Sequence, residues 1–197
     1  MNSPAAPGTP SVPTTLDEFM AQALHMELDA VQRYNEFADM METHNSPEVG
    51  EWFRKMAVVE GKHAAQIMTE MGWTQAPART LASVFEGFEA AETPAIDEVH
   101  YLMQPWHVLQ LALANEQRAE RFFAHLASVT TVESVRKAAL ELQQEEREHV
   151  ELVKAWMQKV PQPDSNWDHD PDPPRYDEIH PSRAIHPAAN DDGSRGE

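Results

Sequence analysis

Two copies of the pattern Glu-x-x-His are the residues of this chain best suited to bind a metal ion. Glu60 with His63 is the first copy, and Glu146 with His149 is the second. On an α-helix, residues three positions apart are separated by about 60° around the axis and about 4.5 Å along it, so both side chains can reach one ion. A single Glu-x-x-His is expected about once by chance in a chain with this many Glu and His residues, so neither copy indicates a site by itself.

Two further glutamates show that the pattern is duplicated. Glu27 precedes Glu60 by 33 residues, and Glu116 precedes Glu146 by 30 residues. Each half of the chain therefore supplies one glutamate followed by one Glu-x-x-His, as two copies of one helical hairpin would do. The weaker alternative is that solvated charges fall into register by chance.

The apolar residues around these glutamates predict that the glutamates face a core. In four segments, apolar residues recur at spacings of three and four, and one glutamate interrupts each apolar seam near its middle. Four ionised carboxylates at one level of a dry core are strongly destabilising unless positive charge lies among them. Two divalent metal ions supply four positive charges against four carboxylates. The predicted ligands are Glu27, Glu60, His63, Glu116, Glu146 and His149.

Two neighbouring side chains leave alternatives open. Glu145 lies four residues before His149, but Glu146 continues the apolar seam and is the preferred ligand. Tyr34 lies two turns after Glu27 on the same helix face. It can hydrogen-bond a ligand carboxylate, donate one electron, or serve as an ordinary core tyrosine.

Other residues that can bind metals are expected to have different roles. Five histidines have no partner at ligand spacing on an inward seam, so we expect surface positions or indirect roles for His25, His44, His100, His107 and His125. Thioethers bind hard iron poorly, so we expect packing roles for Met26, Met40, Met41, Met56, Met68 and Met71. The acidic, histidine-containing stretches 167–170 and 177–180 are expected to be solvated rather than to bind metal.

The seams require four long helices. The first is expected from about residues 14–17 to 43, and the second from Pro47, after the capping residue Ser46, to about residue 71. The third is expected over 105–127 and the fourth, after a turn at 128–131, to about residue 159. Residues 73–104, with a candidate short helix over 81–91, connect the second helix to the third. No strand pattern is present, so the predicted class is all-α: a four-helix bundle with one long crossover between helices two and three.

Composition limits what such a bundle can do. The 197 residues carry a formal net charge of −18, which disfavours nucleic-acid binding. They contain no cysteine, which excludes iron–sulfur clusters and disulfides. No apolar run approaches the roughly 18 residues that span a membrane, and the N-terminus has no signal-peptide pattern, so we expect no membrane partner and a cytoplasmic location.

Proline-rich stretches at both ends predict three regions. Residues 1–13 contain four prolines and are predicted to be a disordered arm, and residues 14–160 to form the bundle. Residues 161–197 are rich in Pro and Asp and are predicted to be an irregular tail. We expect the tail to contact the bundle through Trp167, Tyr176 and Ile179.

At these residues the chain resembles the rubrerythrin and bacterioferritin branch of the ferritin-like superfamily, over about residues 15–160. The segment QQEEREHVELVKAWM is similar to the last bundle helix of rubrerythrins. The resemblance implies a ferritin-like bundle with a non-haem di-iron centre that reacts with hydrogen peroxide or dioxygen. It also implies that the six predicted ligands bind iron and that Tyr34 contacts a ligand.

Two departures from the rubrerythrin pattern change this expectation. Typical rubrerythrins carry a rubredoxin domain with four cysteines, whereas this sequence has none, so electrons must come from another protein or from iron. Rubrerythrins usually place an extra glutamate three residues from the one on the third helix, but here Leu113 and Ala119 flank Glu116 at that spacing and Glu120 is one position too far. The resemblance therefore favours a six-ligand, bacterioferritin-like centre.

The leading functional hypothesis is an oxidoreductase that reduces hydrogen peroxide or dioxygen while ferrous iron is oxidised. The expected cofactor is two iron ions, and manganese is an alternative because it shares these ligands. An external electron-donor protein and a homo-oligomer, a dimer or larger, are the expected partners. The alternatives are iron oxidation and sequestration in a cage, oxygenation of an organic substrate and, as the weakest, a metal-free helical interaction module.

Overall fold

The computed structural model describes residues 12–79 and 99–170, and within them it contains four α-helices and no strand. The helices are α1 (Leu16–Thr43), α2 (Pro47–Glu70), α3 (Pro105–Val129) and α4 (Glu133–Met157). The all-α class and the four predicted helices are confirmed. The candidate short helix over 81–91 lies outside the described residues, as do 1–11 of the predicted arm and 171–197 of the predicted tail.

Helix α1 begins where side chains supply the missing backbone partners. Thr15 Oγ1 accepts a hydrogen bond from the Glu18 backbone N–H at 3.1 Å. The Glu18 carboxylate in turn accepts hydrogen bonds from the backbone N–H and the hydroxyl of Thr14. Helix α1 ends at Thr43, and Asn45 then adopts a positive φ of 59°, a conformation that asparagine tolerates, at the turn into α2.

Helix α2 begins at Pro47 as predicted but without the expected cap, and helix α3 ends later than predicted. The Ser46 side chain makes no capping hydrogen bond, so α2 begins with Pro47, whose fixed φ suits the first helical turn and whose missing N–H is not needed there. Helix α3 continues through Ser128 and Val129, which were predicted to lie in a turn. It ends because Thr130 takes an extended conformation.

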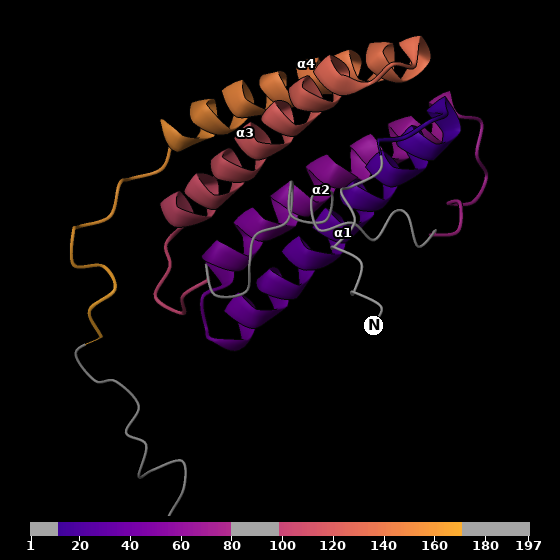
Figure 1. Ribbon diagram of the computed structural model, residues 1–197. Coiled ribbons are helices and arrows are strands. Elements are labelled where there is room, and N and C mark those ends of the chain that lie inside the picture. Colours follow the sequence, from indigo (N-terminus) through magenta and orange to yellow (C-terminus); the bar gives the residue numbers. More distant parts are fainter. Residues whose placement is uncertain (1–11, 80–98, 171–197) are drawn as a thin grey trace, which may run out of the picture.

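The helices form two antiparallel hairpins that face each other. Helix α1 packs mainly on α2, and α3 packs mainly on α4. Figure 1 shows the two hairpins as separate layers, with α1–α2 in purple and α3–α4 in salmon to orange. The duplication predicted from the sequence is therefore also a duplication in space.

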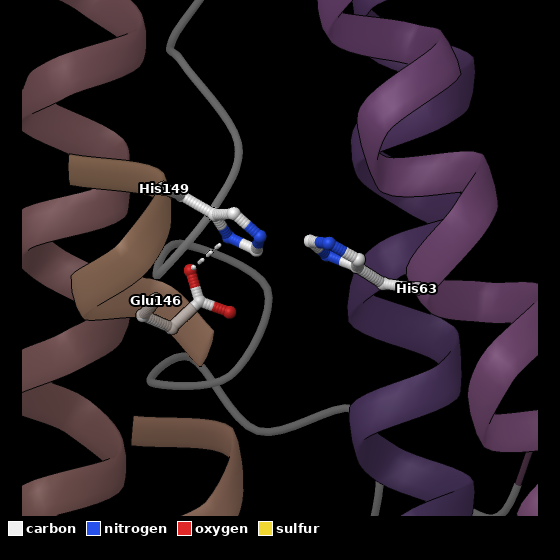
Figure 2. Close-up of side chains that lie close together, drawn as sticks. All are labelled: His63, Glu146 and His149. Atoms are coloured by element: carbon white, nitrogen blue, oxygen red, sulfur yellow. Dashed lines mark ion pairs between the residues drawn. The ribbon is translucent and has the colours of Figure 1, made fainter. Parts of the chain in front are cut away.

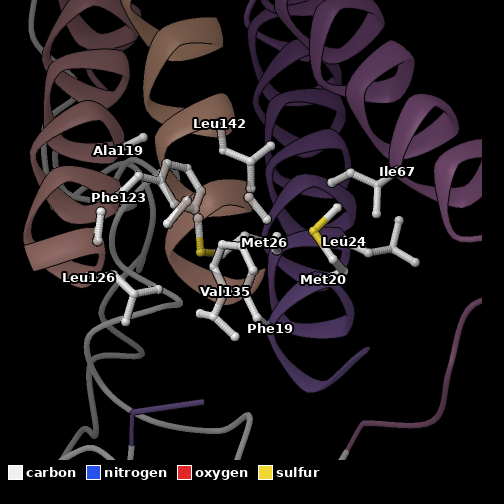
Figure 3. Packing of buried hydrophobic residues seen from close by; sticks show 14 of the residues in the cluster. Phe19, Met20, Leu24, Met26, Ile67, Ala119, Phe123, Leu126, Val135 and Leu142 are labelled. Atoms are coloured by element: carbon white, nitrogen blue, oxygen red, sulfur yellow. The ribbon is translucent and has the colours of Figure 1, made fainter. Parts of the chain in front are cut away.

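Two apolar clusters fill the space between the hairpins. The first (Figure 3) includes Phe19, Leu24, Met26, Ile67, Ala119, Phe123, Val135 and Leu142. The second includes Ala30, Tyr34, Phe37, Phe53, Leu109, Ala112 and Val153. In each helix, the candidate glutamate lies in sequence between residues of one cluster and residues of the other, as Glu27 lies between Met26 and Ala30. The clusters therefore lie on either side of the level at which the glutamates meet.

The methionines pack as predicted. Met26, Met41 and Met56 are at most 3% exposed. The partly buried methionines lie against the two clusters and are Met40, Met68 and Met71. None of the four described helices is both long enough and apolar enough to cross a membrane.

The chain beyond α4 returns to the bundle through Trp167. The centroid of its ring lies 3.8 Å from that of His107, which is at the start of α3. Three residues later, Asp170 accepts a hydrogen bond of 2.6 Å from the Tyr101 hydroxyl. The predicted contact through Trp167 is confirmed. The other two predicted contact residues lie outside the described chain: Tyr176 and Ile179.

Candidate metal centre

The four predicted glutamates are buried at one level between the hairpins. Glu27, Glu60, Glu116 and Glu146 are between 1% and 4% exposed. At least one residue three or four positions from each glutamate belongs to an apolar cluster, so the helix register directs each glutamate inward. The structure thus brings together one carboxylate from each of the four helices.

Hairpin α1–α2 places its three candidate ligands together. His63 Nδ1 lies 3.7 Å from Glu27 Oε2 and 3.6 Å from Glu60 Oε2. Glu60 and His63 are one helical turn apart on α2, and Glu27 reaches them from α1. One atom of each residue belongs to a group in which all the ligand atoms lie within 4.8 Å of one another.

Hairpin α3–α4 repeats this arrangement. His149 Nδ1 lies 3.5 Å from both Glu116 Oε2 and Glu146 Oε2. The two halves meet at their histidines, because the rings of His63 and His149 are stacked with centroids 4.1 Å apart. Figure 2 shows these rings facing each other from opposite layers. The structure therefore brings all six predicted ligands into one cluster with approximate two-fold symmetry.

Burial controls the protonation of the two most strongly affected carboxylates. Burial, together with the charge of Glu116, raises the pKa of Glu60 well above its usual range. Burial raises the pKa of Glu116 to about 8, with the charge of Glu146 adding to this effect and His149 opposing it. Both shifts express the cost of holding a carboxylate charge in an apolar environment.

The two histidines respond in opposite ways to the same kind of surroundings. Burial, with the charges of His149 and Lys62, lowers the pKa of His63 to about 4. Burial also acts to lower the pKa of His149, but the carboxylates of Glu116 and Glu146 outweigh it and raise this pKa to about 10. The symmetry of the six residues is therefore geometric but not electrostatic.

The cluster fits a pair of metal ions better than it fits a hydrogen-bond network. Its N···O distances of 3.5 to 3.7 Å exceed those of good hydrogen bonds. Two donor atoms that are each about 2.1 Å from one metal ion lie about 3.0 to 3.6 Å apart at coordination angles of about 90° to 120°. Glu116 Oε1 and His149 Nδ1 are buried and make no hydrogen bond. The carboxylate and imidazole donors are those that iron and manganese accept.

Glu145, the alternative to Glu146, faces a different neighbour. Its Oε1 accepts a hydrogen bond of 2.8 Å from Gln66 Nε2 on α2. Glu146 is 2% exposed and lies beside His149, whereas Glu145 is half-buried at the edge of the bundle. The geometry therefore favours Glu146 as a member of the cluster.

Tyr34 is fully buried, and its partner is a residue that the sequence reasoning missed. Asn115, which is 2% exposed, donates a hydrogen bond of 3.1 Å from Nδ2 to the Tyr34 hydroxyl. Asn115 directly precedes Glu116 and lies three residues after the buried Ala112. A polar residue at that helical spacing was the available sequence signal.

The other histidines make contacts outside the cluster. His25 Nε2 lies 2.9 Å from the Pro77 carbonyl oxygen. His107 is 6% exposed, which the sequence did not indicate, and its Nδ1 accepts a hydrogen bond from the Gln104 backbone N–H. Glu120, one position beyond the extra glutamate of rubrerythrins, accepts a hydrogen bond from Arg147 Nε at 3.0 Å.

Two facing helical hairpins with a buried cluster of four glutamates and two histidines define the class of this protein, a ferritin-like four-helix bundle. The chain belongs to the Rubrerythrin family, because the family's sequence model matches residues 18–157. The chain is also similar to an uncharacterized conserved protein from Magnetospirillum magnetotacticum MS-1, whose crystal structure superposes with a TM-score of 0.56. The two are 32% identical over 76% of this chain and 98% of the other. A comparison with curated proteins finds no match.

Proposed function

We propose that this chain is a non-haem di-iron oxidoreductase that reduces hydrogen peroxide or dioxygen. The observation that carries the proposal is the pair of facing Glu, Glu and His triads, one from each hairpin, joined at the stacked rings of His63 and His149. Membership of the Rubrerythrin family supports a di-iron centre at these residues.

The six residues have three different tasks in this proposal. Glu27 and Glu116, each alone on its helix, bind one side of the centre each. Glu60 and Glu146 each lie 3.5 to 3.6 Å from the histidine one turn later on the same helix, so each would hold metal together with that histidine. Four carboxylates balance the charge of two ferrous ions, and the neutral imidazoles of the two histidines bind without adding charge.

Two iron ions, when bound, would together supply the two electrons that reduce peroxide. The protein contributes position and a dry environment. The two apolar clusters lie on either side of the carboxylates and exclude bulk water. Because water screens charges strongly, its exclusion strengthens the electrostatic attraction between the carboxylates and a bound cation. Within the described residues, the histidine side chains are the more exposed members of the cluster, at 12% and 13%.

Tyr34 is the candidate for an additional electron or proton. Its ring packs in the second apolar cluster, and the amide of Asn115 fixes its hydroxyl. A phenol held in this way can donate a hydrogen bond or one electron without reorganisation of its surroundings. Further electrons come from an external donor protein, because none of the 197 residues is a cysteine that could hold a second redox centre.

The test begins with anaerobic titration of the metal-depleted chain with ferrous iron. We expect two irons per chain, and we expect ferric charge-transfer absorbance after addition of peroxide or dioxygen. The matched pair of variants is Glu146→Gln, which should lose iron, and Glu145→Gln, which changes a neighbouring carboxylate outside the cluster and should retain it. Binding of fewer than two irons by the unmodified chain contradicts the proposal.

The same preparation separates the oxidoreductase from an iron-sequestering protein. With a chemical reductant present, an oxidoreductase consumes many equivalents of peroxide or dioxygen per bound iron pair. A sequestering protein instead oxidises added ferrous iron and retains the ferric product. Titration with Mn²⁺ in place of ferrous iron measures which metal the six ligands prefer.

A further inference from the structure

A polar pair of side chains joins the two hairpins beside the candidate centre. Asn115 of α3 donates a hydrogen bond of 3.1 Å from Nδ2 to the hydroxyl of Tyr34 on α1. Both side chains are at most 2% exposed, so the bond lies away from solvent. Neither residue is one of the six candidate metal ligands, but Asn115 directly precedes one of them, Glu116.

The equivalent positions on the other side of the centre hold two apolar residues, Met26 and Phe123. Met26 directly precedes the candidate glutamate of α1, as Asn115 precedes that of α3. Phe123 follows the candidate glutamate of α3 by seven residues, as Tyr34 follows that of α1. Met26 and Phe123 both belong to the first apolar cluster (Figure 3). The two sides of the centre therefore have equivalent ligands but differ in one hydrogen-bonded pair.

Helix geometry brings the Tyr34 hydroxyl toward the level of the ligands. Tyr34 lies two turns after Glu27, but long side chains on a helix lean toward its N-terminus, which here is the direction of Glu27. The hydrogen bond holds the hydroxyl beside Asn115, whose Cα atom is only about 3.8 Å from that of the next residue, Glu116. The phenol therefore reaches from the second apolar cluster, in which its ring packs, toward the carboxylates.

The direction of the hydrogen bond limits where the phenol can donate. The Asn115 amide donates, so the Tyr34 oxygen accepts and its own hydrogen is directed at a different acceptor. The other buried members of the second apolar cluster have hydrocarbon or thioether side chains, which are poor acceptors. Glu116 Oε1, in contrast, is buried and accepts no hydrogen bond. The carboxylates of the candidate centre are thus suited to accept the phenol hydrogen.

We propose that Asn115 is a positioning residue, which holds the Tyr34 hydroxyl with its hydrogen directed at the carboxylates of the centre. This inference rests on the proposed function, in which peroxide or dioxygen oxidises an iron pair bound there. Tyr34 then gives one electron to the oxidised pair and its proton to a ligand carboxylate, as the O–H bond breaks. The product is a neutral phenoxyl radical. The external donor protein later returns the electron, and the carboxylate returns the proton.

An asparagine amide suits this task. It is uncharged, and its Nδ2 can donate to the phenol oxygen and to the phenoxyl oxygen alike, so the bond holds before and after the electron leaves. A methionine, which the other hairpin has at the equivalent position, offers no donor. A buried hydroxyl without a partner lowers stability, which is consistent with phenylalanine rather than tyrosine on that side.

The first test uses the metal-depleted full chain and involves no iron. The variant Tyr101→Phe with Tyr176→Phe leaves Tyr34 as the only one of three tyrosines, so every tyrosyl signal belongs to it. Ultraviolet irradiation of the frozen chain generates the radical, and a hydrogen bond to its oxygen lowers the largest g value in high-field electron paramagnetic resonance. We expect the lowered g value in this parent and a higher one after Asn115→Met. An unchanged g value overturns the proposal.

The variants are chosen to preserve packing. Asn115→Met copies the residue that the other hairpin has at this position, and Asn115→Leu is a second apolar variant that should raise the g value in the same way. Circular dichroism checks that each is folded. The matched control is Met26→Leu, which changes the equivalent buried position on the other side and should leave the g value of Tyr34 unchanged.

The second test asks whether Asn115 acts through Tyr34 in the iron-loaded chain. We expect two irons per chain in Asn115→Met, in Tyr34→Phe and in the double variant. Asn115→Met should slow peroxide consumption in the presence of a reductant about five- to tenfold, which is the effect of one neutral hydrogen bond on a barrier. In the Tyr34→Phe background the same substitution should cause no further slowing.

Equal slowing by Asn115→Met in both backgrounds overturns the proposal, because Asn115 then acts on the ligands and not through Tyr34. An unmodified chain that binds fewer than two irons contradicts the proposed function instead. The g value of the metal-depleted chain distinguishes the two failures, because it depends on the hydrogen bond and not on iron.

Discussion

The two hairpins hold the same three ligand types in the same geometry, but their surroundings differ. In both, a histidine Nδ1 lies 3.5 to 3.7 Å from two carboxylates, one on each helix of its own hairpin. The pKa of His63 is nevertheless lowered to about 4, while that of His149 is raised to about 10. The residue seven positions after the first glutamate is Tyr34 in one hairpin and Phe123 in the other. The two hairpins therefore share their candidate ligands and differ in the packing around them.

The largest expected effect is a loss of stability at Phe123, the position in α3–α4 that corresponds to Tyr34 in α1–α2. Phe123 is fully buried in the first apolar cluster and makes an edge contact with Phe19 at 6.2 Å. Phe123→Ala should lower the free energy of unfolding by about 3–5 kcal/mol, because it leaves a cavity between the hairpins. Urea unfolding measures this loss. A loss below about 1 kcal/mol would show that the site collapses around the smaller side chain.

The next effect concerns the metal ligands and asks whether the hairpins bind independently. His63→Ala and His149→Ala each remove one candidate ligand from one triad. Each variant should bind one of two metal ions more than about 100-fold more weakly, because loss of a residue that only supports a ligand already weakens metal binding by about 10- to 100-fold. Metal content and Mn²⁺ titration give the stoichiometry. Equal loss from the two variants supports equivalent hairpins, and loss of both ions from either variant shows that the centre forms as a unit.

Tyr34→Phe should change chemistry more than stability. Loss of the hydrogen bond from Asn115 should cost about 1 kcal/mol of unfolding free energy, while iron stoichiometry stays at that of the unmodified chain. If Tyr34 supplies an electron, iron oxidation after peroxide addition should slow about tenfold or more and any tyrosyl radical signal should disappear. The reciprocal variant Phe123→Tyr is the control, and an unchanged oxidation rate in Tyr34→Phe assigns Tyr34 to packing alone.

The smallest effect is on the pH dependence of stability in the metal-depleted chain. Glu116, whose pKa is raised to about 8, makes stability fall as pH rises from about 4.5 to 8, because the folded state holds a proton that the unfolded state has lost. The stabilising contribution of His149, whose pKa is raised to about 10, is complete below its unfolded value and is also lost as pH rises. His63, with its lowered pKa, acts in the opposite direction only between about 4 and 6.5.

The melting temperature of the metal-depleted chain should therefore fall by a few degrees between about pH 6.5 and 8. The variant His149→Ala should flatten this dependence, whereas His63→Ala should leave it nearly unchanged. Addition of Mn²⁺ should reverse the fall, since positive charge then replaces the protons. A melting temperature that rises over this interval contradicts the raised pKa values of Glu116 and His149.

Long, regular patterns predicted the helices and the candidate site well. Apolar spacing placed all four helices, and α1 begins and ends within the predicted limits, with the Thr15 side chain capping its start. All six predicted ligands meet in one cluster, since a residue's inward direction on a helix follows from its spacing to apolar neighbours. The predicted cap at Ser46 is not formed, although α2 begins at Pro47 as predicted, and α3 runs past its predicted end at residue 127 to Val129.

Contacts between hairpins could not be read from spacing along one helix. Asn115 and Tyr34 are 81 residues apart and meet only because α1 and α3 pack together. The same is true of Gln66 and Glu145, whose hydrogen bond across 79 residues of sequence holds Glu145 outside the cluster.

The sequence by itself determined the four-helix architecture, the duplication and the identity of the six clustered residues, because helical periodicity is local and repeats along the chain. The tertiary structure decided the burial of each of those residues, the charges near it and therefore its pKa. The histidine pKa values diverge because distance and burial, which act between helices, set the strength of every charge.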